Sequence, residues 1–353
     1  MNGFYNDFNR VVIETPEERQ QKVKEQRRLF SRVFLALLSY ILISHVVTNA
    51  TYTILSVALT REQYIAFATS GIWPVVISSV VQYILAFPIF LLILMGTRKS
   101  QRTEMTSLSL SDFTLLFFIG QTFMFAGNLI GNMINSFFGA LIGKLPENGI
   151  ATAINETPLW VIVIFMVILG PIVEELMFRK IIIDRLSVYG DRVAIIFSAV
   201  SFGLMHGNLY QFFYAAMLGA LLGYVYTKTR KVKYTVYMHM IINFLGSVGT
   251  LIIQDYTFEL QEMLAALQNG APVNVLALLA YATIVFIYSN LQNGMIIAGV
   301  IALVHYIRKR KINISPDKDV YLPDGEIVKN GVSNVGAILF LIATLFLMIL
   351  NLF

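Results

Sequence analysis

The sequence predicts an all-α membrane protein, a polytopic helical bundle of about eight to nine transmembrane helices. Of its 353 residues, 57% are hydrophobic and only 13% are charged, about half the charge density of an ordinary soluble domain. The mean hydropathy is +0.69. Apolar runs of the roughly 20 residues that one bilayer crossing needs recur along the chain. Most of the chain is therefore expected to meet lipid rather than water.

The composition also excludes several kinds of chemistry and partner. The chain has no cysteine, so a disulfide framework, a thiolate metal site and a cysteine nucleophile are all excluded. The net charge is +5, but the basic residues form short clusters between apolar runs. Such clusters orient a chain in a membrane. We therefore expect the lipid bilayer as a partner, and no nucleic acid.

The N-terminal segment, residues 1–32, is predicted to be a cytoplasmic arm. It carries seven Lys or Arg and five acidic residues, and the first long apolar run begins only at Val33. A cleavable secretory signal starts earlier and has fewer acids. The charges from Glu17 to Arg32 alternate at helical spacing, which fits a helix on the membrane surface or a solvated tail.

Nine apolar segments follow, and charge decides how the eighth is read. The predicted spans lie near 33–58, 73–96, 113–143, 159–178, 193–208, 209–227, 234–254, 276–307 and 335–352. Basic clusters follow the second, sixth and eighth segments, whereas Asp255, Glu259 and Glu262 follow the seventh. Basic loops face the cytoplasm, so 276–307 is predicted to cross once. The N-terminus is then inside and Phe353 outside.

The third span carries small residues at helix-packing spacing. Gly127 and Gly131 are four apart, as are Gly139 and Gly143, beside Asn128, Asn132 and Asn135. Small residues at this spacing let helices approach closely. We expect a packing face here, with a polar cavity wall as the alternative.

The fourth span ends in two adjacent carboxylates, Glu174 and Glu175, just behind Pro171. Ionisable groups at membrane depth are costly and are functional candidates by default. Glu175 and Arg179 are four residues apart, so they can form an ion pair on one helix face. Glu174 points about 100° away and has no cation at that spacing, which leaves it as the candidate general base.

Two histidines on later helices are expected to meet these carboxylates. Glu174 and His206 each lie about 15 residues from a turn near 189–191, so a helical hairpin would bring them to similar height. His239 and Asn243 share the face of another helix. For Glu174 and these three residues to meet, the helical hairpin around the turn at 189–191 must protrude from the bilayer on the cytoplasmic side. Its charged residues make this plausible: Arg179, Lys180, Asp184, Arg185, Asp191 and Arg192. His45 lies alone on an apolar span, and His305 lies beside Tyr306 and a basic cluster at the membrane surface, so packing or interfacial roles are expected for both and they are left out of the site.

This constellation can hydrolyse an amide in two ways. In the first, Glu174 deprotonates water, His206 orients it or carries a proton, and His239 with Asn243 stabilises the oxyanion. In the second, Glu174, His206, His239 and Asn243 bind a divalent metal, with zinc the usual choice, which activates the water. The helical zinc motif His-Glu-x-x-His is absent from the sequence. The residues favour neither route.

The ordered motifs Glu174-Glu175-x-x-x-Arg179, Phe202-x-x-x-His206 and His239-x-x-x-Asn243 resemble the CAAX protease and bacteriocin-processing family of intramembrane endopeptidases. The resemblance covers roughly residues 160–246. It implies that Glu174 activates water, that Glu175 and Arg179 support it, and that His206, His239 and Asn243 are catalytic or metal-binding partners. One departure is Lys180, where the family often has Gly.

The sequence therefore predicts an intramembrane endopeptidase of a bacterial plasma membrane. Its substrate would be a membrane-associated protein or peptide, cut near the cytoplasmic interface. We expect N-terminal transmembrane helices over 33–158, a protease-like core over 159–254, and C-terminal helices over 255–353 with a cytoplasmic loop at 308–334. The alternatives are a non-catalytic scaffold or immunity partner with the same fold, and a proton-relay transporter. Oligomeric state, scissile bond and substrate prenylation stay open.

Overall fold

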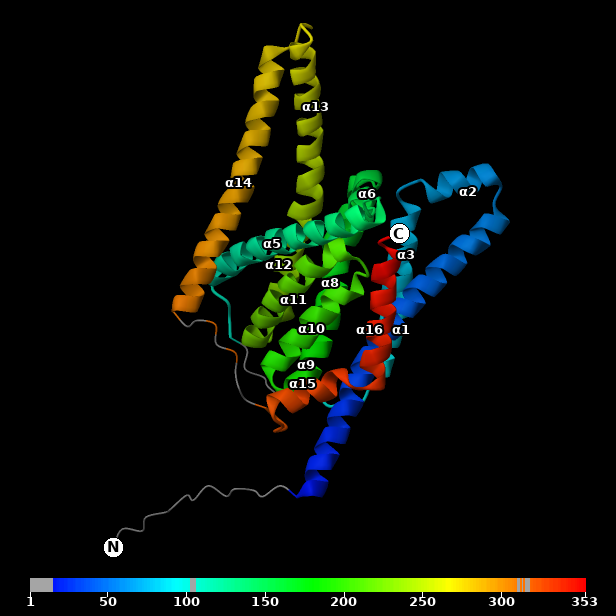
Figure 1. The fold of residues 1–353 in the computed structure, drawn as a ribbon, viewed down its shortest axis with the longest axis vertical. Coiled ribbons are helices and arrows are strands. Elements are labelled where there is room, and N and C mark those ends of the chain that lie inside the picture. The colour runs from blue at the N-terminus through cyan, green and yellow to red at the C-terminus, as the bar shows by residue number, and fades with distance from the viewer. Residues whose placement is uncertain (1–14, 102–105, 310–311, 313, 315–317) are drawn as a thin grey trace.

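A computed structural model describes residues 15–101, 106–309, 312, 314 and 318–353. Within these residues every regular element is a helix, and no strand occurs (Figure 1). The predicted all-α class is therefore confirmed.

The first helix, α1 (Pro16–Ala58), is far longer than one membrane crossing. Thr15 and Glu18 form a reciprocal capping box at its start, next to Pro16. Its 43 residues extend about 65 Å at 1.5 Å per residue. The segment expected to lie on the membrane surface is helical but continues into the first span without a break. Residues 1–14 of the predicted arm lie outside the described residues.

The second span is built from three short pieces in line. After α2 (Arg61–Ala68) come α3 (Trp73–Val80), the π-helical segment η1 (Val81–Ala86) and α4 (Phe87–Ile93). Pro88 lies in the first turn of α4. Proline cannot donate the backbone hydrogen bond of a continuous helix. The wider π turn of η1 lies immediately before Pro88, so the chain continues as a helix although one backbone hydrogen bond is missing.

Helix α5 (Leu110–Ile142) packs closely against α11 (Leu209–Thr229), as its small residues predict. A Cβ atom added at Gly127 would lie 2.4 Å from Tyr214 Cα, and one at Gly131 would lie 2.8 Å from the carbonyl oxygen of Leu209. Asn135 is buried and donates to the carbonyl of Gly131 within its own helix. This face of α5 is a packing face.

The central part of the chain forms three neighbouring helical passes (Figure 1). They follow the short helix α6 (Gly149–Glu156), and the first pass comprises α7 (Leu159–Val161), η2 (Ile162–Leu169), α8 (Gly170–Glu175), η3 (Leu176–Ile183), α9 (Asp184–Leu186) and η4 (Ser187–Tyr189). The predicted turn follows at Gly190, whose φ of 109° suits glycine. Helices α10 (Asp191–Met205) and α11 then run side by side, because Gly203 and Gly219 allow close approach.

The next helices extend the bundle. Helix α12 (Val232–Phe244) leads through η5 (Leu245–Gly249) into α13 (Thr250–Gln268), which forms a projecting hairpin with α14 (Figure 1). Helix α14 (Val275–Arg308) is one unbroken helix, as the charge pattern predicts.

The predicted loop at 308–334 contains a helix, α15 (Asp324–Val332). Sequence reasoning missed it because its apolar content is small, and the contacts that hold it come from α1. Gln26 donates to the carbonyl of Ile327 at 2.9 Å, and Asn330 donates to Gln26. Helix α15 meets the final helix, α16 (Val335–Leu350), at a bend of 63°.

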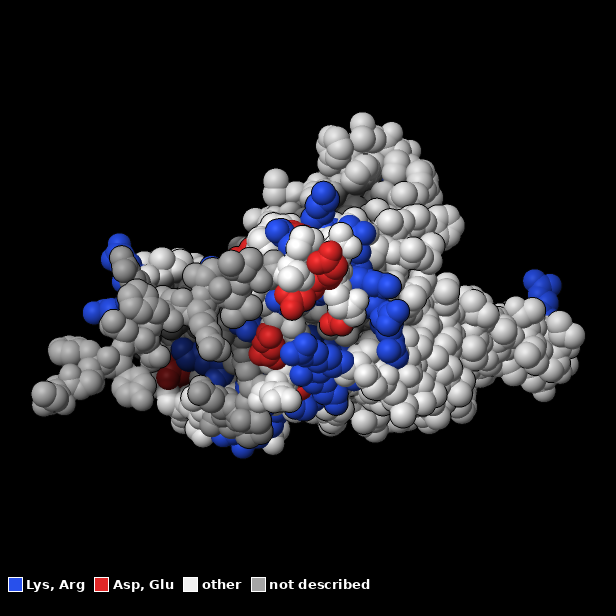
Figure 2. All heavy atoms as spheres, turned by 90° about the horizontal axis from the view of Figure 1, so that it is seen from below, with Lys and Arg blue, Asp and Glu red and all other residues white. Residues whose placement is uncertain are grey.

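Seven helical segments in the described part of the chain are long and apolar enough to cross a membrane, or eight if α15 and α16 count as one. The remaining predicted span is α10, whose 15 residues extend only about 22 Å. Figure 2 looks onto the end at which α1 begins and shows Lys and Arg side chains gathered there. The C-terminus lies on the opposite side of the bundle (Figure 1).

Candidate active site

The two adjacent carboxylates have different environments. The side chain of Glu175 is completely buried, whereas that of Glu174 is 31% exposed. Both lie at the end of α8, between two π-helical segments. Such π turns rotate the side chains that follow them, and they recur at functional sites. Glu174 is therefore the more exposed of the two carboxylates.

Glu175 forms the ion pair that its spacing from Arg179 predicts. Arg179 Nε lies 3.0 Å from Glu175 Oε2, and both side chains are fully buried. The guanidinium carbon lies 4.8 Å from the ring centroid of Phe202 on α10. The two terminal nitrogens of Arg179 have no hydrogen-bond partner among the described residues. The pair is thus enclosed by aromatic rings and connects η3 to α10.

His239 bridges the two carboxylates. Its Nδ1 lies 3.0 Å from Glu175 Oε1, and its Nε2 lies 3.7 Å from Glu174 Oε2. A carboxylate accepts hydrogen bonds, so Nδ1 carries the proton and Nε2 is directed to Glu174. The buried ion pair therefore fixes the orientation of the imidazole that faces the exposed carboxylate.

His206 ends α10 and is oriented by its own helix. Its Nδ1 lies 2.8 Å from the carbonyl oxygen of Phe202, so Nδ1 donates and Nε2 is left as an acceptor. The Phe202 ring packs edge-on against both imidazoles, with centroid distances of 5.1 Å to His206 and 5.8 Å to His239. His206 also lies within electrostatic range of Glu174.

Asn243 lies one helical turn after His239 on α12, as predicted. Its Nδ2 donates to the carbonyl of Met166 at 3.0 Å. Met166 belongs to the π-helical segment η2, in which the backbone hydrogen bonds change register and leave carbonyl oxygens free to accept from a side chain. One amide N–H of Asn243 is thus used to join α12 to the first pass, and the second remains for another acceptor.

The same polar side chains were predicted as possible metal ligands. In the residues that the structure describes, no group of three or more His, Asp or Glu side chains is arranged to hold a metal ion. His239 Nδ1 donates to Glu175 and Asn243 Nδ2 donates to the backbone, so His239 Nε2 and the side-chain oxygen of Asn243 are the atoms that could bind a metal. Because the described residues do not gather three such side chains at one point, we derive no catalytic step through a metal.

Comparisons with known proteins identify the family of the chain. Residues 156–245 match the family model described as "Type II CAAX prenyl endopeptidase Rce1-like". The protein named "Putative membrane peptidase YdiL" of Bacillus subtilis (strain 168) is 30% identical over 180 residues, covering 49% of this chain and 69% of that relative. The chain belongs to the CAAX-protease-like family of membrane peptidases. No solved structure matches it.

The match to the Rce1-like model includes all six predicted site residues. Glu174, Glu175 and Arg179 lie in its first third, and the other three, His206, His239 and Asn243, follow in order. Family membership and the apolar helices together make this chain a multi-pass membrane peptidase.

Sequence reasoning missed two tyrosines that lie outside the Rce1-like match. Tyr40 of α1 and Tyr83 of η1 both lie within electrostatic range of Glu174. The Tyr83 hydroxyl donates to the carbonyl of Phe165 at 3.3 Å and would lie 3.4 Å from a Cβ at Gly170. A tyrosine in an apolar run carries no signal of this kind, because only the packing of helices from different regions places it beside the site.

Proposed function

We propose that the protein is an intramembrane endopeptidase that hydrolyses a membrane-associated protein or peptide, with Glu174 as the base that activates water. One observation carries the proposal: Glu174 is the accessible carboxylate, and it faces a His239 imidazole held by a buried Glu175. A base must be reachable by water and within reach of its partners. Glu175 and Arg179 supply the rigid support, and they do not contact the substrate.

In the proposed reaction, Glu174 takes a proton from a water molecule, and the resulting hydroxide attacks the peptide carbonyl carbon. His206 accepts a hydrogen bond from that water through Nε2 and so orients it. The tetrahedral oxyanion receives hydrogen bonds from the second amide N–H of Asn243 and from His239 Nε2 when that atom carries a proton. Glu174 then passes its proton to the leaving amine as the carbon–nitrogen bond breaks.

We place the reaction near the cytoplasmic interface of a bacterial plasma membrane. The site is assembled from α8, α10 and α12, and the turn at which α10 begins lies at the end rich in Lys and Arg (Figures 1 and 2). Basic ends of membrane proteins face the cytoplasm. This orientation also puts the start of α1 in the cytoplasm and favours a substrate that approaches along the membrane.

The test compares host membranes that contain the native chain with those that contain Glu174→Gln, at matched expression. Gln keeps the shape of Glu174 and removes the base. Glu259→Gln, an exposed position on α13, is the matched control. We expect peptide termini that are present with the native chain and with the control, and absent with Glu174→Gln. Identical peptide sets, together with a preserved cellular phenotype, would instead assign a non-catalytic scaffold role.

A further inference from the structure

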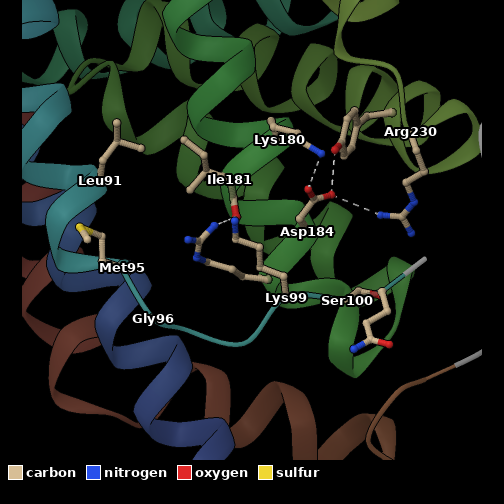
Figure 3. Close-up of a pocket in the computed structure, with 12 residues that line it drawn as sticks. Leu91, Met95, Gly96, Lys99, Ser100, Lys180, Ile181, Asp184 and Arg230 are labelled. Carbon is tan, nitrogen blue, oxygen red and sulfur yellow. Dashed lines mark hydrogen bonds and ion pairs between the residues drawn. The ribbon is translucent and has the colours of Figure 1, made fainter. Parts of the chain in front are cut away.

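A cavity of about 500 Å³ lies outside the candidate active site, at the basic end of the bundle. Figure 3 shows it between the end of α4, the segment that follows α4, and the turns of η3 and α9. Its lining is of two kinds. Leu91, Met95 and Ile181 supply apolar surface, and Lys99, Lys180 and Arg185 supply positive charge.

Arg185 is a buried cation held mainly by uncharged groups. Its side chain donates to Thr97 Oγ1 at 2.7 Å and to the backbone carbonyls of Ile181 and Leu94, each at 3.0 Å. No carboxylate is among its hydrogen-bond partners in the described residues. A guanidinium has five N–H donors, so two remain for an incoming anion. Asp184 attracts the Arg185 guanidinium and Arg32 repels it, so the cost of burying this cation is only partly offset, which favours binding of a negative group.

The one acidic residue in the cavity wall, Asp184, is already shared. Asp184 accepts from Lys180 at 2.9 Å and from the Tyr226 hydroxyl at 2.7 Å, and Arg230 lies 3.8 Å away (Figure 3). Lys99 therefore adds positive charge that Asp184 does not neutralise. The buried hydroxyl of Ser100, also in the wall, has no hydrogen-bond partner among the described residues.

We propose that this cavity binds the phosphate headgroup of an anionic phospholipid. Lysine, arginine and an unpartnered hydroxyl are the donors that a phosphate oxygen accepts. The apolar rim selects the lipid over a free phosphate ion, because Leu91 is 37% exposed and Met95 is 64% exposed, beside the charged wall. Basic pockets between transmembrane helices at the cytoplasmic side bind anionic headgroups by this combination.

Lys180 is the cation in the cavity wall that sets this chain apart from the family it resembles. It stands where the resembling family often has Gly, and a Gly there would remove one of the cations. Lys180 also directly follows Arg179, so a bound lipid would contact the same helical pass that carries the supporting ion pair. The binding proposal itself does not depend on peptidase activity.

The test measures lipid retention by the purified full-length chain in neutral detergent, using native mass spectrometry. The probes are dioleoylphosphatidylglycerol and dioleoylphosphatidylcholine. The variants are Lys99→Gln/Lys180→Gln and a control, Lys228→Gln/Lys233→Gln, which removes the same charge from exposed positions outside the cavity. We expect one preferentially retained phosphatidylglycerol, whose apparent affinity falls about tenfold in the first variant and less than twofold in the control.

Three outcomes would overturn the proposal. Equal weakening in both variants would show diffuse surface attraction, and equal retention of phosphatidylcholine would show no charge recognition. Displacement of the lipid by millimolar inorganic phosphate would assign the cavity to the free ion. Met95→Glu serves as a second variant that leaves every cation in place. It is expected to expel phosphatidylglycerol, because it adds negative charge to the exposed rim, and continued retention would also overturn the proposal.

Discussion

His239 Nδ1 lies 3.0 Å from Glu175 Oε1, and this contact joins residues that are 64 positions apart in the chain. It connects the imidazole to a fully buried ion pair, so that ring orientation and helix packing depend on the same charges. The support of the candidate site is therefore part of the core of the bundle.

We first predict strong coupling between Glu175 and Arg179. Removal of one partner leaves a buried uncompensated charge and is expected to cost about 3–5 kcal/mol of unfolding free energy. Glu175→Gln and Arg179→Met should each destabilise the protein, and the double variant should recover much of the loss. A double-mutant cycle of unfolding in detergent measures this. Additive single effects would contradict the coupling.

We also predict that Asn243→Ala lowers turnover more than it lowers stability. Loss of its hydrogen bond to Met166 should cost about 1 kcal/mol of stability. Loss of an oxyanion donor should reduce kcat about 10²–10³-fold. Kinetics on a peptide identified by the Glu174→Gln comparison, together with a melting curve, separates the two effects. A change in KM with unaltered kcat would exclude the oxyanion role.

Metal removal distinguishes the two hydrolytic routes. We propose the metal-free route, because no group of three or more His, Asp or Glu side chains among the described residues is arranged to hold a metal ion, and activity is then expected to survive extensive dialysis against EDTA and 1,10-phenanthroline. The control is a zinc peptidase treated in parallel, which must lose its activity. Loss of activity in this protein, restored by added Zn²⁺, would establish the metal-dependent route in its place.

Close packing of α5 on α11 gives a test of the fold. Gly127→Ala would place a Cβ atom 2.4 Å from the backbone of Tyr214 and should lower the melting temperature by several degrees. The matched control is Gly294→Ala in α14, where nothing lies within 4 Å of the new atom. That variant should be neutral or slightly stabilising, because alanine favours helix. Equal melting temperatures for the two variants would contradict the packing.

Local pattern predicted most of the helices and the residues of the candidate site. The spacing of Glu175 and Arg179 was sufficient to predict their ion pair, and the charge pattern was sufficient to predict that residues 276–307 form one helix rather than two. Both depend on neighbours in sequence or on a topological rule. Contacts between distant segments were not predictable in this way. Helix α15 depends on Gln26 of α1, and the π segments beside Glu174 depend on how several helices pack.

Tyr83 provides the last prediction, because it lies outside the Rce1-like match and yet touches the helix that presents Glu174. Its hydroxyl donates to the carbonyl of Phe165 in η2 and lies beside Gly170, one turn before Glu174. Tyr83→Phe removes only that hydroxyl. We expect kcat to fall several-fold with little change in KM, because the carboxylate loses its position relative to the water.

The matched control for Tyr83→Phe is Tyr237→Phe on α12, where the tyrosine is 56% exposed. It should leave kcat, KM and the melting temperature unchanged. A purely structural role of Tyr83 would lower the melting temperature and the amount of folded protein without altering kcat per folded molecule. A positioning role would instead lower kcat per folded molecule and leave the melting temperature unchanged. Active-site titration of each variant, together with its melting curve, therefore decides between the two roles.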